Sequence, residues 1–576
     1  MNDVFFENKS LMFVVAAIAA VIAVIILLLA FRRAVRCRFR VTASGGMRPR
    51  LGVTDSFDLD RQRRLVIVRR DDVEHLIMIG GPTDLVVKAR ITHTEGRDLG
   101  EIREGAIPND WLNEATHMSA GTFRPRAVVP RRNARRIQLA LAQTRVKLAE
   151  MLSIRSGLIP LALLSGAAGA ASGFIGGLFR LALRQADQFR ATLPVRWHEQ
   201  PLLGFILMIA GAATATALAV WLVRRFMEHA AGSGIPHIEA VIGGELPPPS
   251  LILLPVKFVG GLLGIGAGLA LGREGPSVQM GATLAHVLGT MFGRNWADCR
   301  SLLAAGAGAG LAAAFNAPFA GSAFVLEELI RQFDVRDAVA ALGATGSAIV
   351  VAQLLTGPAP IFDVGALPHP ELSDNLLCFA LGIIAGMLGV VYNRVILGAL
   401  EITDRLARCP AELRAALIGA AVGALAWFTP SLAGAGEVLI QQTLDATYAL
   451  SLIPFLYVLR LALGAASYAS GAPGGIFAPL LVLGAQMGFF FGTLSHPGLA
   501  DPASYGVMFA VVGMAAFFSA VVRAPLTGMI LVTEMTETST LLLPMLAACF
   551  SAMAVATVLG EPPIYDSLKE RTLLSQ

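Results

Sequence analysis

Apolar runs follow one another from about residue 158 to residue 559, and they limit the possible folds more than any other feature. Several are shorter than the roughly 20 residues that a helix needs to cross a bilayer. Only 15% of the 576 residues are charged, and the mean hydropathy is +0.64. We therefore expect an all-α polytopic membrane protein embedded in a lipid bilayer, because a β-barrel would show short alternating segments instead.

An arginine and a glutamate interrupt the apolar segment 251–292, within the sequence GREGP at 272–276. A carboxylate at membrane depth is costly and indicates a functional position. The neighbouring Gly and Pro allow the helix to break, so that backbone amides can face the side chain of Glu274. We interpret Glu274 as a gate on an anion path.

Two parts of the chain repeat one pattern. NAPFAG at 316–321 recurs as RAPLTG at 523–528, and GREGP at 272–276 matches GIFAP at 475–479, with offsets of 207 and 203 residues. A glutamate follows the proline of the first pair by nine residues each time; these are Glu327 and Glu534. Related halves predict a pseudo-twofold pore in which the breaks converge near the middle of the membrane. Chance similarity of Gly- and Ala-rich segments is the alternative.

The broken helices predict an anion site. GSGIP at 232–236 adds a third break, with a serine hydroxyl in it. Helix N-termini carry unpaired N–H groups and a partial positive charge, which attract anions. A site without a full Lys or Arg charge binds an anion weakly enough to release it. In the repeat, Phe477 stands where Glu274 stands, and at each motif a kink for helix packing is the alternative.

The order GSGIP, GREGP, GGIFAP, with AAAFNAP between the second and third, resembles the chloride channel and transporter (CLC) family over roughly residues 137–576. The resemblance implies the CLC fold, with two inverted-topology repeats of broken helices (roughly 157–335 and 375–560). It also implies a homodimer with one pore per subunit that transports chloride and protons, is not an enzyme, and needs no cofactor. It further implies roles for individual residues: anion binding by Ser233, the amides of Ile476 and Phe477, and Tyr565; external gating by Glu274; and internal proton transfer by Glu328.

Two mechanisms remain open. A deprotonated Glu274 competes with the anion and a protonated one does not, which suits exchange, yet a passive gated chloride channel can use the same gate. The resemblance implies that an acid at Glu328 favours exchange, because members that act as channels commonly lack one there. Glu327 is a possible part of the proton path, and a solvated helix end is the alternative for both. GSGIP and GREGP are both intact, which in the family that this chain resembles goes with chloride and not with nitrate or fluoride. His237 stands where the family commonly has an acid. It either alters the pKa values of groups near the intracellular mouth or is a tolerated surface change.

The N-terminal part has a different character. Leu11–Phe31 is long enough to be a membrane anchor, not a cleaved signal. The arginines that follow it place the N-terminus outside and residues 32–155 in the cytoplasm. We expect the membrane to be a bacterial inner membrane. After this anchor and its basic flank (1–40) we expect a small cytoplasmic β module (41–91), with strands at 64–69, 74–79 and 85–91, and a polar, basic linker (92–136) before the transport domain (137–576).

The anchor and about 30 residues of the module resemble the small single-pass flagellar-biosynthesis protein that accompanies the type III export gate. This resemblance implies an assembly component of a secretion apparatus, and an unspecific hairpin is the alternative. The module's partner cannot be named from the sequence. The five scattered cysteines predict neither a metal site nor a disulfide framework, and the net charge of +5 indicates membrane orientation, not nucleic-acid binding. Since the sequence ends soon after Tyr565, we expect no tandem nucleotide-binding domains.

Overall fold

The computed structural model describes residues 51–58, 64–70, 73–79, 85–91, 132–365, 367–496 and 502–574, with side chains from residue 157 onward. These residues divide into two units, one up to Arg145 and one from Val146 onward. The expected anchor, its basic flank and most of the linker lie outside the described residues, so their structure stays a prediction.

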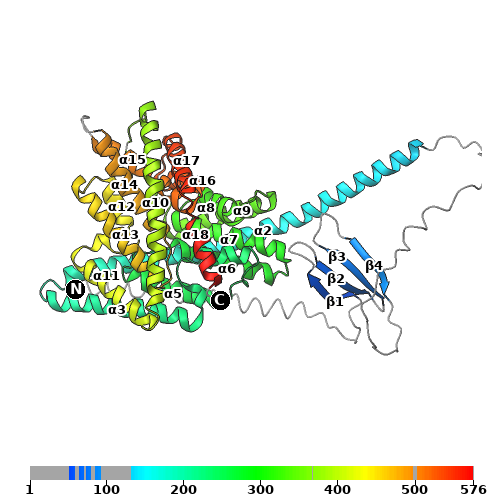
Figure 1. Ribbon diagram of the computed structural model, residues 1–576, viewed down its shortest axis with the longest axis horizontal. Coiled ribbons are helices and arrows are strands. Elements are labelled where there is room, and N and C mark those ends of the chain that lie inside the picture. Colours follow the sequence, from blue (N-terminus) through cyan, green and yellow to red (C-terminus); the bar gives the residue numbers. More distant parts are fainter. Residues whose placement is uncertain are drawn as a thin grey trace, which may run out of the picture. The chain divides into compact units, whose positions relative to one another are not determined.

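The first unit contains a four-stranded antiparallel sheet with the strand order β1-β2-β3-β4 (Figure 1). Strands β2, β3 and β4 lie at the three segments that sequence periodicity indicated, whereas β1 was not anticipated. Its sequence, LGVTDSFD, contains Gly, Asp and Ser, which are uncommon in strands, so pairing with β2 decides its conformation. The four strands are β1 (Leu51–Asp58), β2 (Arg64–Arg70), β3 (Val73–Ile79) and β4 (Leu85–Ile91).

The regular secondary structure of the second unit is helical in the residues that the structure describes, apart from two isolated bridges (Figure 1). Eight of its helices are long and apolar enough to cross a membrane, so the expected all-α polytopic membrane fold is confirmed. The helices are α2 (Arg132–Arg196), α3 (Pro201–Phe226), α4 (Ile235–Ile242), α5 (Leu253–Gly266), α6 (Glu274–Met291), α7 (Trp296–Phe315), α8 (Pro318–Phe324), α9 (Val335–Thr356), α10 (Leu372–Arg405), α11 (Ala411–Phe428), α12 (Glu437–Leu444), α13 (Ile453–Ala469), α14 (Phe477–Ser495), α15 (Pro502–Val522), α16 (Pro525–Thr536), α17 (Leu542–Val558) and α18 (Ile564–Leu574).

Helix ends in the two halves correspond. Helix α7 ends just before Asn316 and α15 ends just before Arg523, and both residues adopt a left-handed backbone, with φ of 55° and 70°. An Ala-Pro pair follows each one, and the proline begins the next short helix, α8 or α16. Proline suits the first position of a helix because its missing N–H would be unpaired there anyway. Helix α8 then runs into a π-helical turn, η3 (Val325–Leu329).

Glycines let the broken helices approach their neighbours closely in both halves. A Cβ on Gly281 of α6 would lie 2.2 Å from the Gly306 carbonyl oxygen of α7, and one on Gly484 of α14 would lie 2.5 Å from the Gly513 oxygen of α15. Neither position can accept a side chain without moving a backbone. Small residues at such contacts are how helices pack in lipid. The repeat seen in the sequence is therefore a repeat of structure.

Candidate anion and proton site

The three Gly- and Pro-containing breaks meet through backbone hydrogen bonds. The Gly272 N–H donates to the Gly475 carbonyl at 2.8 Å, and the Gly475 N–H donates to the Gly272 carbonyl at 2.7 Å. The Gly474 N–H donates to the Gly232 carbonyl at 3.0 Å. Gly272 and Gly475 are equivalent positions of the repeat, so the two halves pair at the point where both helices break.

Three helices begin at this junction. Helix α4 starts at Ile235, α6 at Glu274 and α14 at Phe477, and none of the three has a side-chain hydrogen bond at its N-cap. The first-turn N–H groups of a helix lack intrahelical partners and carry the positive end of the helix dipole. Together, these N-termini form an environment that favours a negative charge.

The carboxylate of Glu274 lies at the N-terminus of α14. Its side chain is fully buried, and its Oε1 accepts a hydrogen bond from the Ala478 N–H at 2.8 Å. Its Oε2 has no hydrogen-bond partner among the residues that the structure describes. A Cβ on Gly475 would lie 3.0 Å from Oε1, so glycine leaves the room that the carboxylate uses. An acid of the first half thus binds an amide in the first turn of a helix of the second half.

Ser233 lies beside the backbone of the Glu274 segment. A Cβ on Gly275 would lie 2.5 Å from the Ser233 carbonyl oxygen and 2.7 Å from its Oγ. The Ser233 side chain is 1% exposed, and its hydroxyl has no hydrogen-bond partner within the described part of the chain. A buried hydroxyl without a protein partner can donate a hydrogen bond to an anion, because such groups otherwise incur a desolvation cost.

The other expected anion-site residues are also buried. Ile476 is the N-cap of α14, and Phe477 begins that helix with its ring packed against Phe518 at 4.5 Å between centroids. Tyr565 is fully buried on α18, which packs against α4, and its hydroxyl has no hydrogen-bond partner among described residues. Hydrogen bonds and close contacts join Ser233, Glu274 and the start of α14, whereas Tyr565 lies on the C-terminal helix, α18.

Two cavities approach the junction. One, of about 950 Å³, is lined by Ser233, Tyr468 and residues of α18, among others. The second, of about 230 Å³, is lined by Arg273, next in the chain to Glu274, and by Glu437. Glu274 lines neither cavity. The fully buried Glu274 therefore follows Arg273, which lines the smaller cavity, in the chain. It also lies near Ser233, which lines the larger cavity.

These features agree with comparisons against known proteins. The family model described as "Voltage gated chloride channel" matches residues 215–557. The chain belongs to this family. The H(+)/Cl(-) exchange transporters ClcA of Citrobacter koseri and Salmonella typhimurium are 36% and 37% identical to it over 425 residues, which are 72% of this chain and 90% of each relative.

Solved structures of proteins with the CLC fold are also similar to this chain. A slow cyanobacterial Cl-/H+ antiporter is similar with a TM-score of 0.68 and 32% identity, over 72% of this chain and 98% of the antiporter chain. A eukaryotic CLC transporter has a TM-score of 0.62 at 23% identity, over 72% of this chain and 74% of its own, and supports the fold alone. The expected CLC fold is confirmed.

The adjacent acids Glu327 and Glu328 have separate environments in this voltage gated chloride channel family member. Glu328 is 3% exposed. The Glu327 carboxylate accepts hydrogen bonds from the N–H groups of Leu526 (3.0 Å) and Thr527 (2.6 Å) and from the Thr527 hydroxyl, at the start of α16. The alternative of two solvated acids at a helix end is therefore wrong. A place for Glu327 on the proton path stays a prediction.

Sequence reasoning assigned no role to one buried charge near the site. Lys257 of α5 is fully buried, and its Nζ donates to the carbonyls of Ala230 (3.0 Å) and Gly232 (2.8 Å), just before GSGIP. A charge within an otherwise apolar run was the available signal for it. His237 is 4% exposed and stacks on His229, with ring centroids 4.6 Å apart, so its interpretation as a surface change is wrong.

Proposed function

We propose that this protein is a secondary active transporter that exchanges chloride for protons across a membrane, with Glu274 as the group at which the two compete. One observation carries the proposal: the Glu274 carboxylate accepts the Ala478 N–H in the first turn of α14, a position suited to an anion. The similarity to proteins named as H(+)/Cl(-) exchange transporters and to a Cl-/H+ antiporter supports exchange over passive conduction.

The geometry links the two ions through one carboxyl group. When Glu274 is ionised, it accepts the Ala478 N–H and occupies the helix N-terminus. A chloride ion arriving from the Ser233 side competes with it for these donors. When Glu274 takes up a proton, its attraction to the amides falls, and the chloride replaces it. Each cycle of the carboxyl group therefore connects the movement of an anion to that of a proton.

Exchange needs a second group that delivers protons from the other side, and we propose Glu328 for it. Its carboxyl group is buried, and it lies on η3, which packs against α4, the helix that follows Ser233. A passive gated chloride channel would need no such acid. Ser233, the amides of Ile476 and Phe477, and the Tyr565 hydroxyl are the donors that we propose for the anion.

Flux measurements on reconstituted vesicles test the proposal. The vesicles are loaded with chloride, diluted into low chloride at equal pH on both sides, and followed with a chloride electrode and a proton-sensitive dye. We expect chloride efflux to drive protons inward against their own gradient. Chloride efflux without proton movement would establish the channel alternative instead.

The variant Glu328→Gln separates the two ion paths. Glutamine has nearly the shape of glutamate but takes up no proton at neutral pH, so proton uptake should fall to background while chloride efflux continues. Glu537→Gln is the matched control, because Glu537 is an exposed acid beyond the end of α16. It should keep both fluxes. Full proton coupling in Glu328→Gln would exclude Glu328 from the path.

We further propose that the protein is a homodimer in a bacterial inner membrane, with the N-terminus outside and residues 32–155 in the cytoplasm. The bacterial relatives and the arginines after residue 31 support the membrane and the orientation. Light scattering of the detergent-solubilised protein tests the dimer, and protease accessibility in intact cells tests the orientation. A role for the N-terminal module in a secretion or flagellar assembly remains the alternative function of another class.

A further inference from the structure

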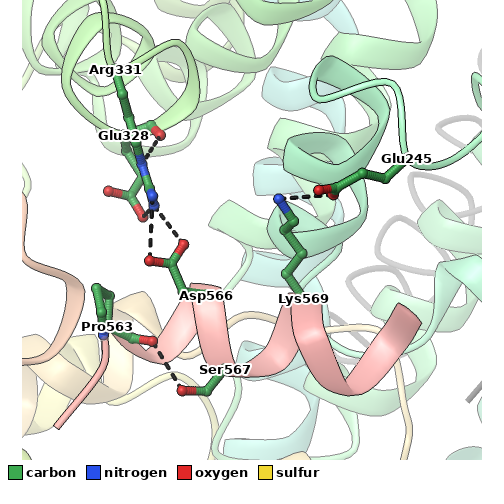
Figure 2. A network of polar contacts seen from close by, with 7 residues as sticks. All are labelled: Glu245, Glu328, Arg331, Pro563, Asp566, Ser567 and Lys569. Carbon is green, nitrogen blue, oxygen red and sulfur yellow. Dashed lines mark hydrogen bonds and ion pairs between the residues drawn. The ribbon is translucent and has the colours of Figure 1, made fainter. Parts of the chain in front are cut away.

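Helix α18, which carries Tyr565, is joined to neighbouring elements by ion pairs, two of which Figure 2 shows. A third joins Arg571 of α18 to Asp404 of α10. The Asp566 carboxylate binds the guanidinium of Arg331 through both oxygens, at 2.7 Å from Nη2 and 3.3 Å from Nη1. The Lys569 Nζ lies 2.8 Å from Oε2 of Glu245, in the segment after α4. Asp566 is the residue next to the proposed anion donor Tyr565, so the first pair is the one closer to the site.

Arg331 also contacts Glu328. Its Nε donates to the Glu328 carbonyl at 3.1 Å, and its Nη2 lies 3.5 Å from Glu328 Oε1. Figure 2 shows the guanidinium between the two carboxylates, with Glu328 on one side and Asp566 on the other. The backbone of Arg331 is left-handed, with φ of 55°, which is uncommon for a residue with a side chain. This conformation turns the chain after η3 and directs the guanidinium back to Glu328.

The two ends of this link have different exposure. Glu328 is 4% exposed as a side chain, whereas Arg331 is 49% and Asp566 is 37% exposed. The chain of contacts Glu328–Arg331–Asp566 therefore runs from a buried acid to the exposed surface of the second unit, which we call the transport unit. Hydrogen bonds to the Asp566 carboxylate raise the pKa of Arg331, and the charges of Glu328 and Glu239 act in the same direction. Arg331 remains a cation at any pH at which the protein works.

Other charges also act on Glu328. Glu239 on α4 is 7% exposed and interacts electrostatically with Glu328, Arg331 and Asp566. Glu327 lies beside Glu328 on η3, and Lys569 of α18 acts on Glu239. Helix α8 carries no charged side chain. Helices α7 and α9 pack against η3, but among the described residues none of their charged side chains has an ion pair or hydrogen bond with Glu328; they are Asp298, Arg300, Arg336 and Asp337.

We propose that Arg331 is a positioning residue for exchange, which holds the proton acceptor Glu328 and, through Asp566, the helix of Tyr565 in one arrangement. This inference rests on the exchange function proposed above. Arg331 supplies the positive charge that directly contacts Glu328, while Asp566 engages that charge from the other side. The balance between them sets the pH at which Glu328 accepts a proton from the cytoplasm. Neither residue needs to touch chloride.

Removing each partner should move this pH in opposite directions. Arg331→Gln removes the cation beside Glu328 and leaves it near Asp566 and Glu239, so the neutral form of Glu328 is favoured and proton uptake should persist to higher pH. Asp566→Asn removes a competing carboxylate and leaves Arg331 to Glu328 alone, so proton uptake should require lower pH. A nearby charge typically moves such a midpoint by about one pH unit or more.

The experiment measures chloride-driven proton uptake in reconstituted vesicles as a function of pH, with chloride efflux recorded in parallel. We expect the midpoint of proton uptake to rise in Arg331→Gln, to fall in Asp566→Asn, and to return toward the wild-type value in Arg331→Lys, which keeps the charge. Chloride efflux should persist in all three variants and shows that each has folded. Glu245→Gln is the matched control, because it breaks a different ion pair of α18, the one with Lys569, and should leave the midpoint unchanged.

Each other result contradicts the inference. If Arg331→Gln and Asp566→Asn shift the midpoint pH of proton uptake in the same direction, the ion pairs only stabilise α18. An equal shift in Glu245→Gln would mean the same. If a variant also loses chloride efflux, the dependence of proton uptake on pH in Arg331→Lys tests the inference instead. A shift of its midpoint as large as that in Arg331→Gln would exclude a charge effect. Absence of proton uptake in the unmodified protein would instead overturn the exchange function itself.

Discussion

At the scale of single residues, protonation of Glu274 weakens its hydrogen bond with the Ala478 N–H. The Ala478 N–H binds the charged carboxylate more strongly than the neutral acid, because hydrogen bonds to an ionised group are about twice as strong as neutral ones. A glutamine side chain can still accept this hydrogen bond, but weakly, and it does not titrate. The group thus binds the helix amides strongly only when it lacks a proton.

The variant Glu274→Gln should therefore conduct chloride without moving protons. We expect chloride efflux to lose its dependence on pH across the range in which the unmodified protein responds, and proton uptake to vanish. Glu437→Gln serves as a control, since Glu437 pairs with Arg273 at 2.9 Å, next to the gate, but does not touch the α14 amides. It should remain coupled. Loss of chloride flux in Glu274→Gln would contradict a gating role.

At the scale of helices, each half of the repeat caps the other. Glu327 accepts N–H groups at the start of α16, and Glu534 accepts those of Phe319 (3.1 Å) and Ala320 (2.7 Å) at the start of α8. These two glutamates are the repeat-related acids of the sequence. A carboxylate stabilises a helix N-terminus by filling its unpaired donors and by interacting with the dipole.

Matched variants separate capping from proton transfer. Glu327→Gln and Glu534→Gln should each lower the stability of the detergent-solubilised protein by about 1 kcal/mol, seen as a lower Tm. If Glu327 only caps α16, both variants keep proton coupling in vesicles. Loss of coupling in Glu327→Gln alone would place Glu327 on the proton path. An unchanged Tm in both would contradict the capping role.

Sequence patterns predicted the elements better than the contacts between them. The repeat offset of 203 residues identified Gly272 and Gly475 as equivalents, and the structure pairs them directly. The Arg331–Asp566 pair joins residues that are 235 positions apart. It follows no periodicity, and neither residue interrupts an apolar run as Glu274 does. Its existence depends on how α18 packs, which local sequence does not determine.

Lys257 shows the same limit. Its charge within an apolar segment was visible in the sequence, but the Ala230 and Gly232 carbonyls that it binds became apparent only in the fold. Buried charges are retained where backbone acceptors satisfy them. Here the satisfied lysine fixes the chain that leads into the Ser233 segment.

At the scale of the whole molecule, the transport unit accounts for the similarity to known proteins. The matched 72% of this chain covers 98% of the cyanobacterial antiporter chain and 90% of the Citrobacter koseri relative. The family match begins at residue 215, far beyond the four-stranded sheet. Every residue that we propose for anion or proton binding lies between Ser233 and Tyr565. The N-terminal module therefore contributes no group to the proposed exchange mechanism.

Deletion of residues 1–136 should accordingly leave exchange unaltered. The described part of α2 from Gly157 onward is apolar enough to span a membrane by itself, so the shortened chain keeps the first span of the transport unit. We expect the same ratio of protons to chloride in vesicles as for the full chain, and the same response to Glu274→Gln. A deletion that reaches into this span, removing residues 1–170, is the contrasting control and should abolish transport. If the shorter deletion changes the ratio, the N-terminal module acts on the transport cycle itself, and the mechanism cannot rest on the transport unit alone.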